Sequence, residues 1–257
     1  MRAKRTTGLS PEQFADLIYL VEEEIGQWNP VTGRLRALPL AKAVKATVMY
    51  FKNNITQEVI GELLEVSQPT ISRVIADLET VICAVLAEWV PDLDEAITGR
   101  VVIVDGTLTP CWSWADVEDL YSGKHKTTGH NHQVLVCSTG RLLHISDPLP
   151  GARHDTHCIE HSGLLDRLDL DNTIGDKGYL GTGMHTPYRR PAGGELLGWQ
   201  KEFNAAISRI RSTVEREIAN WKTWRITHTD YRRPEHTYQK AFNAVRALHF
   251  FKLQSEF

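Results

Sequence analysis

The spacing of apolar residues changes partway along this chain of 257 residues, and that change constrains its fold more than any other feature. Before residue 91, apolar residues recur at helical spacing, as Phe14, Leu17 and Val21 do. After an acidic linker at 92–99 the spacing becomes extended, beginning with the apolar run 101–104. The chain is therefore expected to have an all-α N-terminal part and a later part that contains strands.

The N-terminal part holds two predicted helices, 10–27 and 38–51, and then a bihelical pattern over 56–78. In this pattern Thr56 and Ser67 each stand at the N-cap position of a short helix. Two short helices with a tight turn also occur as plain scaffold, so both interpretations stay open. We favour a helix-turn-helix because side chains that suit base edges and phosphates face outward near the start of the second helix: Gln68, Thr70, Ser72 and Arg73.

The part after residue 100 alternates predicted strands and helices, which is typical of an α/β domain. Strands at 131–137 and 141–145 flank Ser138-Thr139-Gly140 and predict a hairpin, so the sheet is mixed rather than purely parallel. We therefore expect a helical DNA-binding region at 1–95 and an α/β catalytic domain at 96–257. The other expected elements are helices 155–168, 202–224 and 238–253 and a strand that contains Ile174 and ends at Asp176.

Three acidic residues in different local settings are candidates for one metal site. Asp105 ends the apolar run 101–104, Asp176 follows Thr173-Ile174-Gly175, and Glu215 lies in an Arg-rich amphipathic helix. A few carboxylates together with substrate phosphate are the oxygen ligands that Mg²⁺ prefers. Two such ions can hold the attacking and leaving oxygens of a phosphoryl displacement. A lone Asp at a strand end is more often a turn residue, but two that each follow an apolar strand favour a metal-dependent DNA-processing enzyme.

The third carboxylate has a rival in its own helix. Glu215 lies on the shoulder of the apolar stripe, beside Arg211, whereas Glu217 projects closer to the centre of that stripe. A buried carboxylate needs a partner or a cation. Spacing alone therefore leaves both glutamates open.

Several short motifs along most of the chain resemble the DDE transposases of bacterial insertion sequences, in the branch related to the eukaryotic Harbinger elements. Each motif is short, but their order and spacing together are specific. They comprise the bihelical pattern, Val-Asp-Gly-Thr at 104–107, Tyr-Ser-Gly-Lys at 121–124, Pro-Gly-Ala-Arg-His-Asp at 150–155, Gly-Asp-Lys-Gly-Tyr at 175–179 and Val-Glu-Arg-Glu-Ile at 214–218.

This resemblance implies a ribonuclease H-like fold whose catalytic, metal-binding carboxylates are Asp105, Asp176 and Glu215. It implies that Mg²⁺ or Mn²⁺ is the cofactor, and that the activity is cleavage of transposon ends followed by joining of the 3′-OH to target DNA. It also implies a homodimer or larger assembly on double-stranded DNA. Asp155 belongs to the family's Arg-His-Asp stretch and is expected near the site, as a helix N-cap, as an outer-shell metal group, or as both.

The charge of the chain is distributed unevenly, although the net charge is only −3. Residues 76–120 carry ten acidic side chains against one basic, whereas residues 201–257 carry eleven basic against six acidic. A basic face can hold a phosphate backbone even when the whole chain is acidic, although differently solvated surfaces would give the same asymmetry. The basic residues expected to contact DNA, besides Arg73, are Lys124, Arg153, Lys177, Arg211, Arg216 and Lys222.

Other classes of protein fit the sequence less well. No apolar run approaches the length of a membrane span and no signal peptide is expected. Four scattered cysteines without a C-x-x-C pair favour a reduced, cytoplasmic protein. As a DNA-binding protein it is expected to be nucleoid-associated. The glycines at 175–183 lack the ending of a P-loop, and the histidines at 154–161 lack a convincing fourth zinc ligand.

Two alternative functions remain open from the residues. One is a DNA-binding regulator derived from such an enzyme, with its catalytic site unused. The other is a purely hydrolytic nuclease of the same fold. The end sequences and the target site are not encoded in any pattern of this chain.

Overall fold

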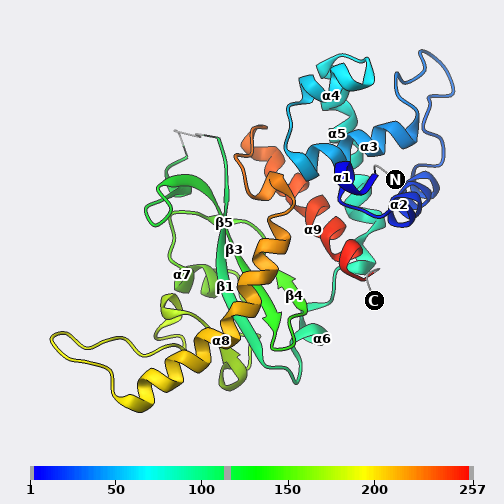
Figure 1. Ribbon diagram of the computed structural model, residues 1–257. Helices are drawn as coiled ribbons and strands as arrows, with labels where there is room; N and C mark the ends of the chain where they lie inside the picture. Colours follow the sequence, from blue (N-terminus) through cyan, green and yellow to red (C-terminus); the bar gives the residue numbers. More distant parts are fainter. Residues whose placement is uncertain (1–2, 113–116, 255–257) are drawn as a thin grey trace. The chain divides into compact units, whose positions relative to one another are not determined.

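A computed structural model of the protein describes residues 3–112 and 117–254 (Figure 1). The chain divides into two compact units. One is a helical unit formed by residues up to Val90 together with residues from Lys222 onward, and the other is an α/β unit, Pro91–Trp221. The predicted domain boundary near residue 95 is therefore close to the first boundary between the two units, which lies between Val90 and Pro91. The C-terminal segment groups with the helical unit rather than with the α/β unit.

The helical unit confirms the predicted N-terminal helices to within a few residues. Ser10 forms a capping box with Gln13, and the Thr56 side chain accepts a hydrogen bond from the Val59 N–H, so two predicted starts coincide with real caps. The elements of this unit are α1 (Ala3–Thr7), α2 (Pro11–Ile25), α3 (Leu40–Asn53), α4 (Gln57–Leu64), α5 (Gln68–Val85), η1 (Ala87–Trp89), η5 (Arg225–Thr227), η6 (Glu235–Thr237) and α9 (Tyr238–Gln254).

The core of the helical unit lies where α5 packs against α3 and α9. Because α9 is apolar on most of its surface, it needs a partner over its whole length, which explains why the C-terminal segment returns to this unit. Arg233 donates to Glu79 of α5 at 2.6 Å, and Glu79 is only 2% exposed. Two ion-paired groups are thus built into the core of the unit.

The α/β unit is organised around a mixed sheet, so the predicted mixed α/β class is confirmed. Strand β3 pairs with β1 along the whole of β1, from Val102↔Cys137 to Pro110↔Gly129, in antiparallel orientation. Strand β6 pairs with β1 in parallel. The strands are β1 (Val102–Pro110), β2 (Tyr121–Ser122), β3 (Thr127–Cys137), β4 (Leu142–Ile145), β5 (Leu149–Pro150) and β6 (Thr173–Ile174), in the order β2-β3-β1-β6, with β4 and β5 also paired to β3.

The predicted hairpin is confirmed, with Gly140 in the turn between β3 and β4 at φ 96°. Three other details differ from expectation. Strand β1 continues to Pro110 because β3 pairs with it beyond Asp105, so Asp105 lies in mid-strand rather than at a strand end. Strand β6 stops two residues before Asp176. The helix expected at 155–168 is the shorter α7 (Asp155–His161), since Gly163 adopts φ 70° soon after it.

The long helix α8 (Gly198–Trp221) packs against β1 and β3, as Figure 1 also shows. Its buried residues are Ile207, Val214 and Trp221, at spacings of seven residues, so one stripe of the helix faces the sheet. Helix α6 (Leu93–Ile97) precedes the sheet, and Asp92 caps it. This arrangement brings the Arg-rich helix predicted from the sequence to the strand that carries Asp105.

Candidate active site

Asp105 occupies the middle of β1, and its side chain is 17% exposed. One oxygen accepts a hydrogen bond from the Gly106 N–H at 2.9 Å, and the other accepts from Arg211 of α8, also at 2.9 Å. Burial nevertheless raises the pKa of Asp105 from 3.8 to about 6, against the lowering effect of Arg211, and the charge of Asp176 raises this pKa further. Burial therefore disfavours the ionised form of Asp105 even though Arg211 is paired with it.

Asp176 lies just beyond β6, at the N-cap of η4 (Lys177–Tyr179). Its Oδ1 accepts a hydrogen bond from the Gly178 N–H at 2.6 Å, which fixes the side chain at the start of the turn. Its influence on the pKa of Asp105 means that the two carboxylates interact electrostatically. Asp105 and Asp176 therefore lie close enough for the charge of one to affect the other.

Asp155, the first residue of α7, is a third carboxylate at this site. It is nearly buried, with Oδ1 accepting from Asn131 and Oδ2 accepting from Lys124, both at 3.1 Å. A methyl group added at Gly106 would come within 3.0 Å of Asp155 Oδ1, and one at Gly178 would lie 3.1 Å from Asp155 Oδ2. Asp155 therefore lies against the neighbours of both Asp105 and Asp176.

The expectation that Asp155 caps a helix is wrong, because the N-cap position of α7 is His154 and Asp155 is already inside the helix. Its side chain instead points to Asn131 and Lys124. The reason is competition: a buried carboxylate gains more from a cation and an amide donor than from a single backbone N–H.

A buried chain of hydrogen bonds leads to Asp155 and was not foreseen from the sequence. The Tyr179 hydroxyl donates to Gln133 Oε1 at 2.6 Å, Gln133 Nε2 donates to Asn131 Oδ1 at 2.9 Å, and Asn131 donates on to Asp155. Burial raises the pKa of Tyr179 well above 10, so its hydroxyl keeps the proton that it donates. The available sequence clue was the pair of amides, Asn131 and Gln133, at alternate positions in β3 and therefore on one face of the strand.

Glu215, the third predicted acid, is exposed on α8 and lies one helical turn after Arg211. Residues four apart on a helix share a face, so Glu215 is on the face whose Arg211 contacts Asp105. Glu217, six residues after Arg211, is half-buried on a different face. The position of Arg211 therefore favours Glu215 over Glu217 as the glutamate turned toward Asp105.

Asp105 and the carboxylates near it fit a hard divalent cation by their chemistry, since carboxylate oxygens are the ligands that such ions prefer. Within residues 3–112 and 117–254, however, no three His, Cys, Asp or Glu side chains are arranged to hold one ion together. This is also true of the histidines at 154–161, of which His157 and His161 stack on each other. Asp105 and Asp176 are thus brought together, and Glu215 is left on the adjacent helix face.

The basic residues expected to contact DNA fall into two groups. In the α/β unit, Arg211 is bound to Asp105 and Lys124 to Asp155, whereas Arg153 is paired with Asp119 on the surface at 3.1 Å. Lys177 and Arg216 are exposed. The predicted residues of the helical unit are Gln68, Thr70, Ser72, Arg73 and Lys222; of these, Gln68 and Arg73 are exposed, and burial lowers the pKa of Lys222.

Across the described parts of the chain, no helix has the length and apolar character that a membrane crossing requires.

Comparison with known proteins shows the family of the chain. Residues 104–249 match the family model described as DDE superfamily endonuclease. A protein of Streptomyces albus G, named as a transposase for insertion sequence element IS112, is 32% identical over 222 residues, which cover 86% of this chain and 83% of the relative. A second, from Microchaete diplosiphon and named as a transposase for IS702, is 24% identical over 97% of this chain and 94% of its own length. No solved structure matches the chain significantly. The chain therefore belongs to the DDE superfamily of endonucleases, among the transposases of insertion sequences.

Proposed function

We propose that the protein binds the ends of its insertion sequence, cleaves phosphodiester bonds there with divalent metal ions, and joins the freed 3′-OH to target DNA. The observation that carries this proposal is the electrostatic coupling of the Asp105 and Asp176 carboxylates beside Arg211 of α8. A buried carboxylate whose ionised form is disfavoured is stabilised when a cation binds beside it, and carboxylate oxygens are ligands that hard cations prefer.

Asp105, Asp176 and Glu215 would hold Mg²⁺ or Mn²⁺, which supplies Lewis-acid activation of the nucleophile and stabilisation of the leaving oxygen. Asp105 has the central role because it interacts with both Asp176 and α8. Its present partner, Arg211, keeps the carboxylate oriented and lowers its pKa. Cation binding would let the Arg211 guanidinium turn to a DNA phosphate.

Asp155 acts on the reaction through Lys124. The series of side-chain hydrogen bonds from Tyr179 through Gln133 to Asn131 fixes the Asp155 carboxylate. Asp155 in turn holds the Lys124 ammonium at 3.1 Å. The Lys124 side chain is 64% exposed, so its charge faces the solvent side of the site, where a DNA phosphate would approach. Lys124 is therefore assigned to phosphate binding and Asp155 to positioning.

The rest of the proposal concerns architecture. The α/β unit would be a ribonuclease H-like domain, since it combines a mixed sheet with carboxylates on β1 and after β6. Helices α4 and α5 would be a helix-turn-helix in which Gln68, Thr70, Ser72 and Arg73 meet double-stranded DNA. Two ends must be processed together, so a homodimer or larger assembly on DNA is expected.

The test is a gel assay with the full chain, Mg²⁺, a labelled duplex carrying the element end, and a target plasmid. Joined product supports the proposal, cleavage without joining supports a hydrolytic nuclease, and a mobility shift without cleavage supports a DNA-binding regulator. Asp105→Asn and Asp176→Asn should abolish cleavage while the mobility shift is retained. Cleavage at the wild-type rate by either variant would remove that residue from the proposed site.

A further inference from the structure

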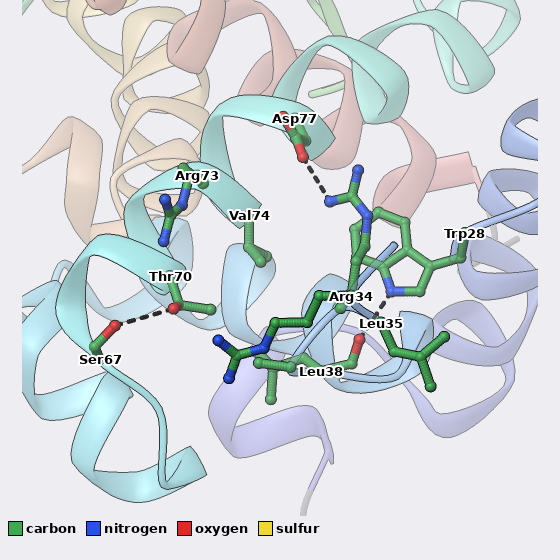
Figure 2. A pocket seen from close by; sticks show the side chains of 11 residues that line it. Trp28, Arg34, Leu35, Leu38, Ser67, Thr70, Arg73, Val74 and Asp77 are labelled. Carbon is green, nitrogen blue, oxygen red and sulfur yellow. Dashed lines mark hydrogen bonds and ion pairs between the residues drawn. The ribbon is translucent and has the colours of Figure 1, made fainter. Parts of the chain in front are cut away.

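A pocket of about 660 Å³ lies in the helical unit, far in sequence from the proposed catalytic residues. The segment between α2 and α3 forms one wall, and the first half of α5 forms the other, as Figure 2 shows. Its lining includes Trp28, Arg34 and Leu35 from the first wall and Ser67, Thr70 and Arg73 from the second. The pocket therefore joins a loop to the face of the helix that carries the predicted base-reading side chains.

The loop wall is held in a definite conformation by several contacts. The Trp28 indole N–H donates to the Leu38 carbonyl at 2.8 Å, and the Arg36 guanidinium lies over the Trp28 ring at 4.0 Å. Arg36 also forms an ion pair with Asp77 of α5 at 2.7 Å. Asp77 is the single carboxylate among the lining residues, and Arg36 balances its charge.

Two guanidinium groups in the lining have no acidic partner among the residues that the structure describes: Arg34 and Arg73. Figure 2 shows Arg34 extending from the loop toward the α5 wall, where Thr70 and Arg73 project. Two unbalanced positive charges in one hollow produce a positive local potential and concentrate anions there. Arg36, the third guanidinium of the lining, is paired with Asp77, so Arg34 and Arg73 are the two that are available to a ligand.

The lining selects among classes of ligand. A metal cation is disfavoured by two guanidinium groups. An apolar ligand is disfavoured because Arg34, Thr70 and Arg73 would lose hydration without gaining partners. An oxyanion suits the lining, because guanidinium groups bind phosphate through paired N–H donors. The hydroxyls of Ser67 and Thr70 share a hydrogen bond at 3.0 Å, which leaves one O–H of the pair to donate to a ligand.

We propose that this pocket binds a phosphate of the DNA backbone and makes the α2–α3 loop a phosphate-contacting element beside α5. The proposal rests on the proposed DNA-binding function of the helical unit. A duplex whose base edges meet Gln68 and Ser72 on α5 would place a backbone phosphate beside this helix, within reach of Arg34 and Arg73. Such contacts fix the register of a duplex and are insensitive to its sequence.

The experiment measures DNA affinity of the full chain by fluorescence anisotropy over a series of salt concentrations, with an element-end duplex and with a duplex of unrelated sequence. The variants are Arg34→Ala, Arg73→Ala and Arg34→Lys. Arg5→Ala is the matched control, since Arg5 is exposed on α1 of the same unit but does not line the pocket. Each phosphate contact contributes about 0.9 to the slope of log affinity against log salt.

Arg34→Ala should weaken binding to both duplexes by a similar factor and reduce the salt slope by about 1. Arg34→Lys should retain most of the slope, because it keeps the charge, and Arg5→Ala should leave the slope unchanged. An unchanged slope for Arg34→Ala, or an equal loss for Arg5→Ala, overturns the assignment of the pocket.

Two further outcomes separate this inference from the function on which it rests. If the wild-type chain binds neither duplex, the DNA-binding function itself fails. If the wild-type chain binds DNA, but inorganic phosphate stabilises it against heat through Arg34 while Arg34→Ala leaves DNA affinity intact, the pocket holds a free anion and the inference fails alone.

Discussion

The proposed catalytic residue Asp105 should reduce the stability of the free protein at neutral pH, so that its replacement by Asn stabilises the fold. Burial raises the pKa of Asp105 from 3.8 to about 6. The folded state therefore holds the proton of Asp105 more tightly than the unfolded state does. One pKa unit corresponds to about 1.4 kcal/mol, so ionised Asp105 lowers the free energy of unfolding by about 3 kcal/mol above pH 6.

The sign of the pH dependence follows from the same linkage. Below pH 3.8 Asp105 is protonated in both states and contributes nothing, and stability then falls as the pH rises toward 6. Asp105→Asn keeps a neutral side chain next to Arg211 at every pH. The free energy of unfolding of the variant should therefore exceed that of the wild-type protein by about 3 kcal/mol at pH 8 and by about half of that at pH 5.

The assay is urea denaturation followed by circular dichroism, in EDTA so that no divalent cation neutralises the site. Asp166→Asn serves as the control, because Asp166 is an exposed aspartate of the same unit. A wild-type protein that is as stable as Asp105→Asn at pH 8, or a difference that does not shrink at pH 5, would refute the reasoning. It would mean that Arg211 compensates the Asp105 charge fully.

Three further predictions test the surroundings of the site and the core. Gly106→Ala should destabilise the fold by about 1–3 kcal/mol and impair cleavage, because the added methyl group would meet Asp155. Asn131 and Lys124 hold Asp155 in place, so it is not expected to move aside. Unchanged stability in a thermal melt would show that Asp155 is free to move. Tyr179→Phe should lower the free energy of unfolding by about 1–3 kcal/mol, because it leaves Gln133 Oε1 buried without its donor. It should also lower the cleavage rate. Wild-type values of this variant in both urea denaturation and cleavage would show that the series of hydrogen bonds does not position Asp155. Arg233→Met should lower the free energy of unfolding by about 3–5 kcal/mol, since it leaves Glu79 charged and buried without its cation. The double variant Arg233→Met with Glu79→Leu should recover much of that loss in the same denaturation assay. A double variant no more stable than the single variant would contradict the role of the ion pair.

Local patterns predicted much of the fold because they depend on nearby residues. The caps at Ser10 and Thr56 and the turn at Gly140 each follow from a preference of one or two side chains for a backbone conformation. The apolar periodicity likewise located the main helices to within a few residues. Leu63 of α4 is an exception, since it lies at helical spacing from Ile60 and beside Leu64 but is 65% exposed. A helix of only two turns leaves little to distinguish its faces.

Features set by tertiary pairing were beyond sequence reasoning. Asp105 lies in mid-strand because β3 continues to pair with β1 as far as Pro110, which the residues around Asp105 do not reveal. Arg211 was predicted to contact DNA, but in the free protein it is bound to Asp105, since only the packing of α8 on β1 brings the two together. The link from Tyr179 to Asn131 joins residues 48 positions apart through Gln133, and no spacing rule predicts such a contact.

The central claim is that Asp105, Asp176 and Glu215 hold divalent metal ions together. It is tested most directly by anomalous diffraction from crystals of the protein bound to an element-end duplex and soaked in Mn²⁺. The account predicts anomalous peaks next to the carboxylates of Asp105 and Asp176, with the Glu215 side chain turned toward them, and loss of those peaks in Asp105→Asn. Peaks elsewhere in the molecule, or none at these carboxylates at saturating Mn²⁺, would contradict it.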